Sequence, residues 1–180
     1  MFISDDMERT VEIPEEVKVE IENFKVKVTG SKGNLERDFY SPLFKKDIII
    51  KKIDNKISIS SESKRKKVKA MIGTIESHIL NMFEGVTKGF TTKLKIVYMH
   101  FPFTVKISGN EILVNNFLGE KTPRKTKVVG DCKIEVKGDE ITVTGISKED
   151  VGQTAANLEK ATWIKARDRR VFQDGIFRLK

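Results

Sequence analysis

The stretch FKVKVTG at residues 24–30 returns in altered form as FTVKISG at residues 103–109. In both stretches apolar and polar residues alternate up to a glycine, which is the pattern of a half-buried β-strand followed by a turn. The segments that follow also correspond: NLERDF (34–39) to EILVNNF (111–117), and IDNKISIS (53–60) to KGDEITVT (137–144). The sequence therefore indicates an internal duplication, in which each copy contributes several antiparallel strands.

Each copy ends in a segment with helical periodicity. Apolar residues recur at steps of three and four within 64–83, so a helix with one apolar face is predicted there. Ser61 or Ser63 can cap its start, and Gly85 follows its expected end. A second helix is predicted near 147–164, where Ser147 and Asp150 have the spacing of a capping box. We expect each helix to pack on the strands of its own copy, because nothing else in the copy covers them.

The predicted fold class is α+β: a tandem duplication in which each domain is an antiparallel β-sheet structure packed with one α-helix. The boundary falls in EGVTKGF (84–90), where two glycines interrupt the pattern. This gives an N-terminal domain at 1–83 and a C-terminal domain at 84–180. The second copy is expected to open with a strand over TTKLKIVYMH (91–100), in which Leu94, Ile96 and Tyr98 alternate with other residues.

Charge is distributed unevenly along the chain. The 180 residues carry a formal net charge of +8, yet residues 1–22 hold eight acids and two bases, a net −6. Residues 84–180 carry eighteen bases and twelve acids, a net +6, against +2 for residues 1–83. A basic surplus attracts polyanions such as nucleic acid, anionic membranes or acidic proteins. Solubility alone is the bland explanation, but clustering of the bases in one half favours a binding surface.

The sequence shows no set of residues that would support catalysis. Its histidines, His78 and His100, lie at the edge of a helical face and at a strand end, where structural roles are usual. Cys132 is the one cysteine and is interpreted as a small core residue. Gly30-Ser31-Lys32-Gly33 matches the GXXG loop of KH domains, but here it joins two strands, so a hairpin turn explains it. We expect no enzyme activity, cofactor, metal or small-molecule substrate.

The chain also gives no targeting signal. The N-terminus MFISDDMERT is acidic and has no apolar run, and no stretch approaches the ~20 apolar residues of a membrane-spanning helix. A protein of the cytoplasm, with no membrane partner, is expected.

The bases of the second half gather in two places. Residues 119–127 follow a strand and contain Lys121, Arg124, Lys125 and Lys127, in a segment whose glycine and proline suggest an exposed loop. Residues 165–170 follow the second helix and contain Lys165, Arg167, Arg169 and Arg170. Bases at loops and helix ends suit contacts with phosphates, because several can reach one nucleic-acid backbone. Trp163 stands beside the second cluster, where an aromatic ring can stack on a base.

Several long motifs closely resemble the L-six family of large-subunit ribosomal proteins, in its archaeal form. The resemblance extends from about residue 10 to the C-terminus. The motifs are VTGSKG (28–33), NMFEGVTKGF (81–90), VYMHFPF (97–103), NFLGEK (116–121), GQTAA (152–156) and RDRRVFQDGI (167–176).

The resemblance implies a non-enzymatic structural protein of the cytoplasmic ribosome. It implies that large-subunit rRNA is bound mainly by the C-terminal domain, near the sarcin–ricin region where translational GTPases dock. Neighbouring large-subunit ribosomal proteins would be further partners. Carried over to this chain, the rRNA contacts fall on Lys121, Arg124 and Lys125 in the loop, and on Lys165, Arg167, Arg169 and Arg170 after the helix. The alternative is a protein-interaction module with an incidental basic surface.

Overall fold

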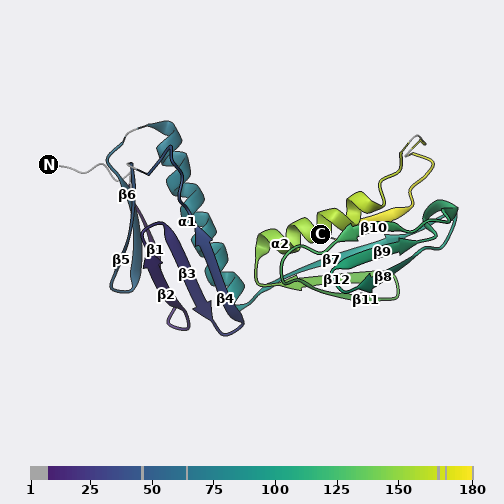
Figure 1. Cartoon of the computed structure of the whole chain (residues 1–180), viewed down its shortest axis with the longest axis horizontal. Coiled ribbons are helices and arrows are strands. Elements are labelled where there is room, and N and C mark those ends of the chain that lie inside the picture. The colour runs from purple at the N-terminus through teal and green to yellow at the C-terminus, as the bar shows by residue number, and fades with distance from the viewer. Residues whose placement is uncertain (1–7, 46, 64, 166, 169, 180) are drawn as a thin grey trace. The chain divides into compact units, whose positions relative to one another are not determined.

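A computed structural model of the chain describes residues 8–179 apart from residues 46, 64, 166 and 169. The chain divides into two compact units, unit 1 (residues 1–88) and unit 2 (residues 89–180). Each unit contains antiparallel sheets and one α-helix, as Figure 1 shows, which confirms the predicted α+β class. The division lies five residues beyond the domain boundary suggested by the sequence, because the first helix continues past residue 83.

Unit 1 holds two three-stranded antiparallel sheets among its described residues, in the orders β1-β6-β5 and β2-β3-β4. Helix α1 contacts both sheets, so one core is shared by all three layers. The elements are β1 (Glu8–Glu12), β2 (Lys18–Glu22), β3 (Lys25–Gly30), β4 (Gly33–Asp38), β5 (Ile48–Ile53), β6 (Lys56–Ser61) and α1 (Lys66–Thr87). Fully buried side chains at its centre include Val26, Val28, Ile57, Ile59, Ile75 and Ile79.

Unit 2 holds a three-stranded sheet, β10-β9-β8, and a four-stranded sheet, β11-β12-β7-β13, both antiparallel. Helix α2 contacts strands of both sheets. The elements are β7 (Phe90–Val97), β8 (Thr104–Ser108), β9 (Glu111–Asn115), the 3-10 turn η1 (Phe117–Gly119), β10 (Arg124–Lys127), β11 (Lys133–Lys137), β12 (Glu140–Gly145), α2 (Lys148–Ala161) and β13 (Gly175–Arg178). Leu94, Ile112, Phe117, Ile141, Leu158 and Ile176 form the centre of its core.

The segments that repeat in the sequence form equivalent hairpins. FKVKVTG and NLERDF become β3 and β4, while FTVKISG and EILVNNF become β8 and β9. Both hairpins close with two-residue turns, since Gly30 pairs with Gly33 and Ser108 with Glu111. The GXXG segment is thus a hairpin turn, as expected, and does not join two helices as in a KH domain.

The two copies differ in their third strand. In unit 1, β2 precedes the repeated hairpin and pairs with β3. In unit 2, β10 follows the hairpin and pairs with β9, on the opposite side. The added strand of unit 2 is the one that contains Arg124, Lys125 and Lys127, so the departure from the duplicated plan falls within the basic segment.

The turn of the β3–β4 hairpin packs on the end of α1. The backbone N–H of Lys32 donates to the carbonyl of Val86 at 2.9 Å, and the Lys32 ammonium donates to the carbonyl of Lys88. The last carbonyls of a helix receive no hydrogen bond from within the helix. The turn supplies donors for two carbonyls at this end of α1. This contact also explains why α1 ends at Thr87 rather than near residue 83, with Gly85 buried inside the helix.

The two helix starts differ in their caps. The expected cap of α1 by Ser61 or Ser63 is wrong: Arg65 stands at the N-cap and its side chain makes no capping hydrogen bond. Ser61 Oγ instead accepts a hydrogen bond from the backbone N–H of Ser63. In α2, Ser147 Oγ accepts from the N–H of Asp150 at 3.3 Å, so the predicted cap is confirmed.

Two finer expectations need correction. Strand β7 ends at Val97, so Tyr98 lies beyond the strand and is exposed, while Leu94 and Ile96 are buried as predicted. Cys132, expected in the core, lies just before β11 and is only half-buried, packed against the core of unit 2; burial raises the pKa of its thiol.

Candidate RNA-binding surface

The first basic segment runs from η1 into β10. Along β10, Arg124 and Thr126 are half-buried whereas Lys125 and Lys127 are exposed. Successive residues of a strand point to opposite faces, so Lys125 and Lys127 extend into solvent on the same side of the sheet. Lys121 is exposed in the loop before the strand. The register is set by β9, with Lys125 opposite Leu113.

Helix α2 holds β10 in place through side-chain contacts with the backbone. The Asn157 amide donates to the carbonyl of Lys127 at 3.2 Å. Thr154 Oγ1 accepts from the N–H of Val129 at 3.0 Å, just after the strand. The exposed lysines of β10 therefore stand on a backbone that is fixed to the core of unit 2.

Arg124 points inward and uses most of its guanidinium on partners within unit 2. Its Nη1 donates to the carbonyls of Ala161 and Trp163, at 3.0 Å each, at the end of α2. Its Nε and Nη2 donate to the two carboxylate oxygens of Glu120, at 2.8 and 2.5 Å. The guanidinium also lies 4.4 Å from the centre of the buried Phe117 ring, and the side chain is 25% exposed. Arg124 thus ties the loop to the end of α2.

The two basic segments lie close to one another in unit 2. Hydrogen bonding and charge from Arg124 lower the pKa of Glu120, and the charge of Arg167 lowers it further. Arg124 of the first segment donates to the carbonyl of Trp163, two residues before the second, so the two segments meet at this point although about forty residues separate them in the sequence.

The second basic segment starts at a buried threonine. Thr162, at the end of α2, donates from Oγ1 to the carbonyl of Glu159 and accepts from the N–H of Ile176 in β13. This bond joins the two ends of the segment 163–174, which connects α2 to β13 (Figure 1). Lys165, Arg167 and Arg170 are exposed in this loop, and Arg169 lies outside the described residues.

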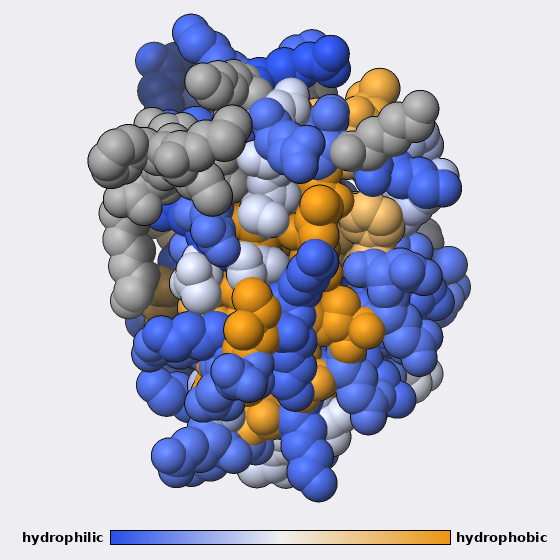
Figure 2. Space-filling model, turned by 90° about the vertical axis from the view of Figure 1, so that its left-hand side faces the viewer, coloured by the Kyte–Doolittle hydropathy of each residue, from blue (hydrophilic) through white to orange (hydrophobic). Residues whose placement is uncertain are grey.

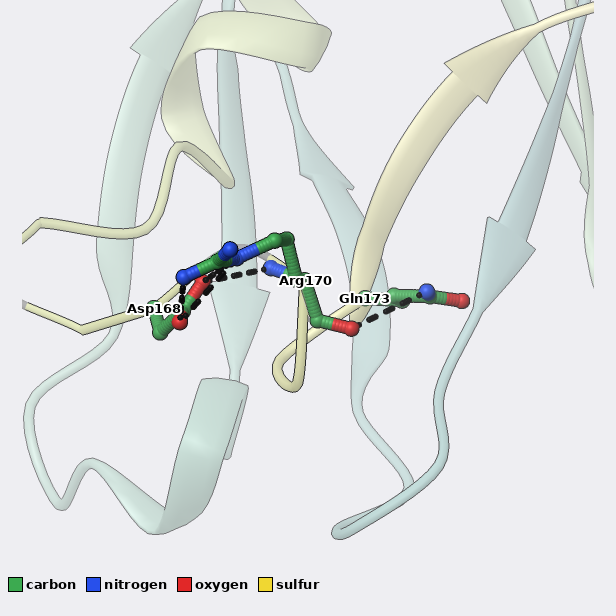
Figure 3. A network of polar contacts seen from close by, with 3 residues as sticks. All are labelled: Asp168, Arg170 and Gln173. Carbon is green, nitrogen blue, oxygen red and sulfur yellow. Dashed lines mark hydrogen bonds and ion pairs between the residues drawn. The ribbon is translucent and has the colours of Figure 1, made fainter.

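Asp168, Arg170 and Gln173 form a local network in the loop (Figure 3). The Asp168 carboxylate accepts from the backbone N–H of Arg170 at 2.9 Å and from its guanidinium at 2.9 to 3.3 Å. These bonds lower the pKa of Asp168. The Gln173 amide donates to the carbonyl of Arg170 at 3.2 Å. The Arg170 side chain is still 91% exposed, so a further anion can reach it.

Asp174 anchors the other end of this loop. Its side chain is 1% exposed and accepts from the backbone N–H groups of Met99 and His100, at 2.8 and 3.1 Å, and from His100 Nδ1 at 2.8 Å. Burial alone would raise the pKa of this carboxyl, but the three hydrogen bonds and the His100 ring lower it overall. Asp174 therefore joins the loop before β8 to the basic loop before β13.

Phe172 lies between a histidine and an arginine. The His100 ring stacks on it with 4.7 Å between ring centres, and the Arg167 guanidinium lies 4.8 Å from its centre. The ring thereby positions Arg167 beside the anchor at Asp174, with the guanidinium still exposed.

The predicted contact residues thus fall into three groups. Arg124 is an internal clamp, and Arg169 is outside the described residues. The other six are each exposed in unit 2: Lys121, Lys125, Lys127, Lys165, Arg167 and Arg170. Of these six, Arg170 alone makes an ion pair with another described residue.

Sequence reasoning missed the anchor formed by His100 and Asp174. The sequence shows Asp174 only as part of the motif RDRRVFQDGI and His100 only as a residue at a strand end. The residues are 74 positions apart, and no spacing rule links them. In the sequence Asp174 stands between Gln173 and Gly175, so no local pattern marks it as buried. Its burial is visible only in the structure, where an ionised group is rarely buried without partners.

The described residues contain no group of three or more histidine, cysteine, aspartate or glutamate side chains that could hold a metal ion. Neither described helix combines the length and apolarity needed to cross a membrane.

Comparison with known proteins gives a consistent result. The family model described as "Ribosomal protein L6" matches residues 13–89 and 101–175, one match for each copy of the duplication. Three curated relatives are all named "Large ribosomal subunit protein uL6". The one from Methanobrevibacter smithii is 50% identical over 98% of this chain and 97% of its own length. Those from Methanosarcina mazei and Staphylothermus marinus are 48% and 50% identical, over 96% and 93% of this chain and 96% and 90% of their own lengths.

Proposed function

This chain belongs to the ribosomal protein L6 family, and from that premise we propose that it binds large-subunit rRNA through the basic surface of unit 2. It is a structural protein of the large ribosomal subunit that acts in translation, and it is not an enzyme. The proposal extends this to the contact residues, which are the six exposed bases of the two segments. A site near the sarcin–ricin region, with translational GTPases and other large-subunit proteins as neighbours, is part of the proposal and rests on family membership alone.

The observation that carries the proposal is the set of cations without carboxylate partners. Lys121, Lys125, Lys127, Lys165 and Arg167 make no ion pair with any described residue. In unit 1 the exposed Lys56 pairs with Glu12 at 2.8 Å, and a base held in this way has less charge to offer a phosphate. Bases left without acids attract phosphates, and each phosphate contact releases counterions from the RNA.

Salt dependence provides the test. We expect Lys165→Ala, Arg167→Ala and Arg170→Ala together to weaken binding of the full chain to deproteinised large-subunit rRNA. The slope of log affinity against log salt should fall by about two to three units, since each phosphate contact contributes ~0.7–0.9. A matched control replaces Lys18, Lys51 and Lys66 of unit 1, which removes the same charge elsewhere. Equal losses in the two triple variants would contradict the proposed surface.

A second candidate role is protein binding by unit 1. Strand β5 is an edge of its sheet, and Ile49 and Ile53 are exposed on the face turned away from the core. Figure 2, which faces the β5 side of unit 1, shows hydrophobic residues among the hydrophilic ones there. Edge strands with apolar residues suit contacts with another protein. We expect Ile49→Glu with Ile53→Glu to leave rRNA affinity unchanged and to weaken retention in whole subunits; unchanged retention would argue against this role.

A further inference from the structure

A hollow of about 690 Å³ opens in unit 2 beside the basic loop. It lies between the end of α2 and β13, and its lining includes Val97, Ile164 and three aromatic residues. Its volume is typical of sites that take a small organic group.

Two of the aromatic rings in the hollow are open to solvent. Trp163 is 52% exposed and Phe177 is 46% exposed, although both are large and apolar. Phe172, the third, is half-buried and already stacked between His100 and Arg167. Large exposed rings that gather in a concave site are a signal of binding rather than of core packing.

Most polar groups of the lining already have partners inside unit 2. Asp174 accepts three hydrogen bonds, Thr162 both donates and accepts, and Glu159 accepts from the N–H of Arg178. Gln173 differs, because its amide donates once, to Arg170, and its oxygen accepts from no described residue. Figure 3 shows this oxygen pointing away from Arg170. An amide with a free acceptor and a second N–H can pair with the edge of a base.

Three bases stand around the hollow, whose own lining contains two carboxylates, Glu159 and Asp174, that accept hydrogen bonds within unit 2. Arg167 lies over Phe172, which lines the hollow, and Arg170 is bonded through its carbonyl to Gln173. Lys165 follows the lining residue Ile164. The nearby acid Asp168 is engaged by Arg170. Apolar rings inside and positive charges around them match a nucleotide, whose base is flat and whose phosphate is negative. They match the side chain of a neighbouring protein less well.

We propose that this hollow binds one unpaired nucleobase of the rRNA, stacked on Trp163, with Gln173 contacting its edge and Arg167 and Arg170 contacting the flanking phosphates. This inference rests on the proposed rRNA binding of unit 2 and deepens it. It adds an aromatic contact to a surface whose other proposed contacts are charged.

Trp163 is the only tryptophan of the chain, so its fluorescence reports on the hollow alone. The full chain is titrated with deproteinised large-subunit rRNA while emission and quenching by acrylamide are recorded. Binding should quench the emission and shield the ring from acrylamide. Trp163→Ala should weaken rRNA binding about tenfold without changing the salt slope, within the range known for base–aromatic stacking. Trp163→Phe, which keeps a ring, should lose less than about threefold.

The outcomes separate this inference from the proposed function. If the wild-type chain binds rRNA but Trp163 emission and the affinity of Trp163→Ala do not change, the nucleobase site is wrong and the charged surface stands. If Trp163 is shielded only in the whole subunit and not by bare rRNA, a protein fills the hollow, and the inference is overturned. If the wild-type chain does not bind rRNA at all, the proposed function fails and the inference fails with it. Both variants should unfold at the wild-type urea midpoint, because the Trp163 side chain is exposed and its carbonyl still accepts from Arg124.

Discussion

Arg124 uses its guanidinium inside unit 2, so its replacement tests stability rather than RNA binding. Arg124→Ala would remove the donors to two carbonyls at the end of α2 and leave Glu120 without its partner. We expect a loss of about 1.5–3 kcal/mol of unfolding free energy, the range for hydrogen bonds to charged groups. Urea denaturation measures it.

The neighbouring residue provides the control. Lys125→Ala removes an exposed lysine from the same strand and should change the unfolding free energy by less than about 0.5 kcal/mol. Arg124→Lys should recover only part of the lost stability, because one ammonium cannot replace the planar fork of donors. If Arg124→Ala were as stable as Lys125→Ala, the internal clamp would be wrong.

Asp174 makes the stability of unit 2 depend on pH in the acid range. Its pKa is lower in the folded chain than the ~3.9 of an unfolded aspartate, so the folded state favours the ionised form. This contribution is fully present above pH ~4 and is lost as the pH falls through the lower, folded pKa.

Asp174→Asn keeps the shape of the side chain and removes the charge. We expect it to be destabilised at pH 7 by about 2 kcal/mol relative to wild type, because the carboxylate accepts three hydrogen bonds. The difference should shrink as urea denaturation is repeated at pH 4 and pH 3. A difference that stays constant down to pH 3 would show that the ionised carboxylate is not the source.

At the scale of elements, the turn of the β3–β4 hairpin packs closely on the end of α1, so a larger residue in the turn should destabilise both. A Cβ built on Gly30 would stand 2.7 Å from a methyl carbon of Val86 and 2.9 Å from its carbonyl oxygen. Gly30→Ala should therefore push the turn away from the helix and cost about 1–3 kcal/mol of unfolding free energy.

Gly73 offers a matched control for Gly30 within the same unit. It lies in α1, and nothing stands within 4 Å of an added Cβ. Gly73→Ala should stabilise the chain by roughly 0.5–1 kcal/mol, since alanine suits a helix better than glycine does. Thermal or urea unfolding measures both variants. If Gly30→Ala were as stable as Gly73→Ala, the close contact between Gly30 and Val86 would be refuted.

The sequence predicted the helices and strands well where the apolar residues recur at a regular spacing over a long enough stretch. The apolar steps of α1 and the alternating strands of both hairpins lie where expected. The end of α1 was missed because it is decided by a distant contact: the carbonyls of Val86 and Lys88 meet the turn at Lys32. The N-terminal cap of α1 was predicted wrongly, because a serine near the start of the helix was expected to cap it. Ser61 Oγ instead accepts a hydrogen bond from the backbone N–H of Ser63.

At the scale of the whole molecule, one plan is used twice with different additions. The repeated hairpins and the helix are common to both units. Unit 2 has β10, which carries bases of the first basic segment, where unit 1 has β2, and it has β13 after the second basic segment. The sequence predicted the duplication and the basic clusters. It could not predict that Arg124 turns inward or that Asp174 fixes the loop, because both depend on partners 37 to 75 residues away. The ribosomal assignment came from family resemblance and not from charge or periodicity.

The most direct test of the central claim is incorporation into the large subunit. Subunits that lack this protein are reconstituted with a chain carrying Lys125→Glu, Lys127→Glu, Lys165→Glu and Arg167→Glu, and its co-sedimentation is measured. The control chain carries Lys18→Glu, Lys51→Glu, Lys66→Glu and Lys67→Glu, an equal change of charge in unit 1. We predict that the control sediments with the subunit at near wild-type level, while the unit 2 variant stays in the supernatant. A urea titration verifies beforehand that the unit 2 variant is folded. Equal sedimentation of both chains would contradict the account.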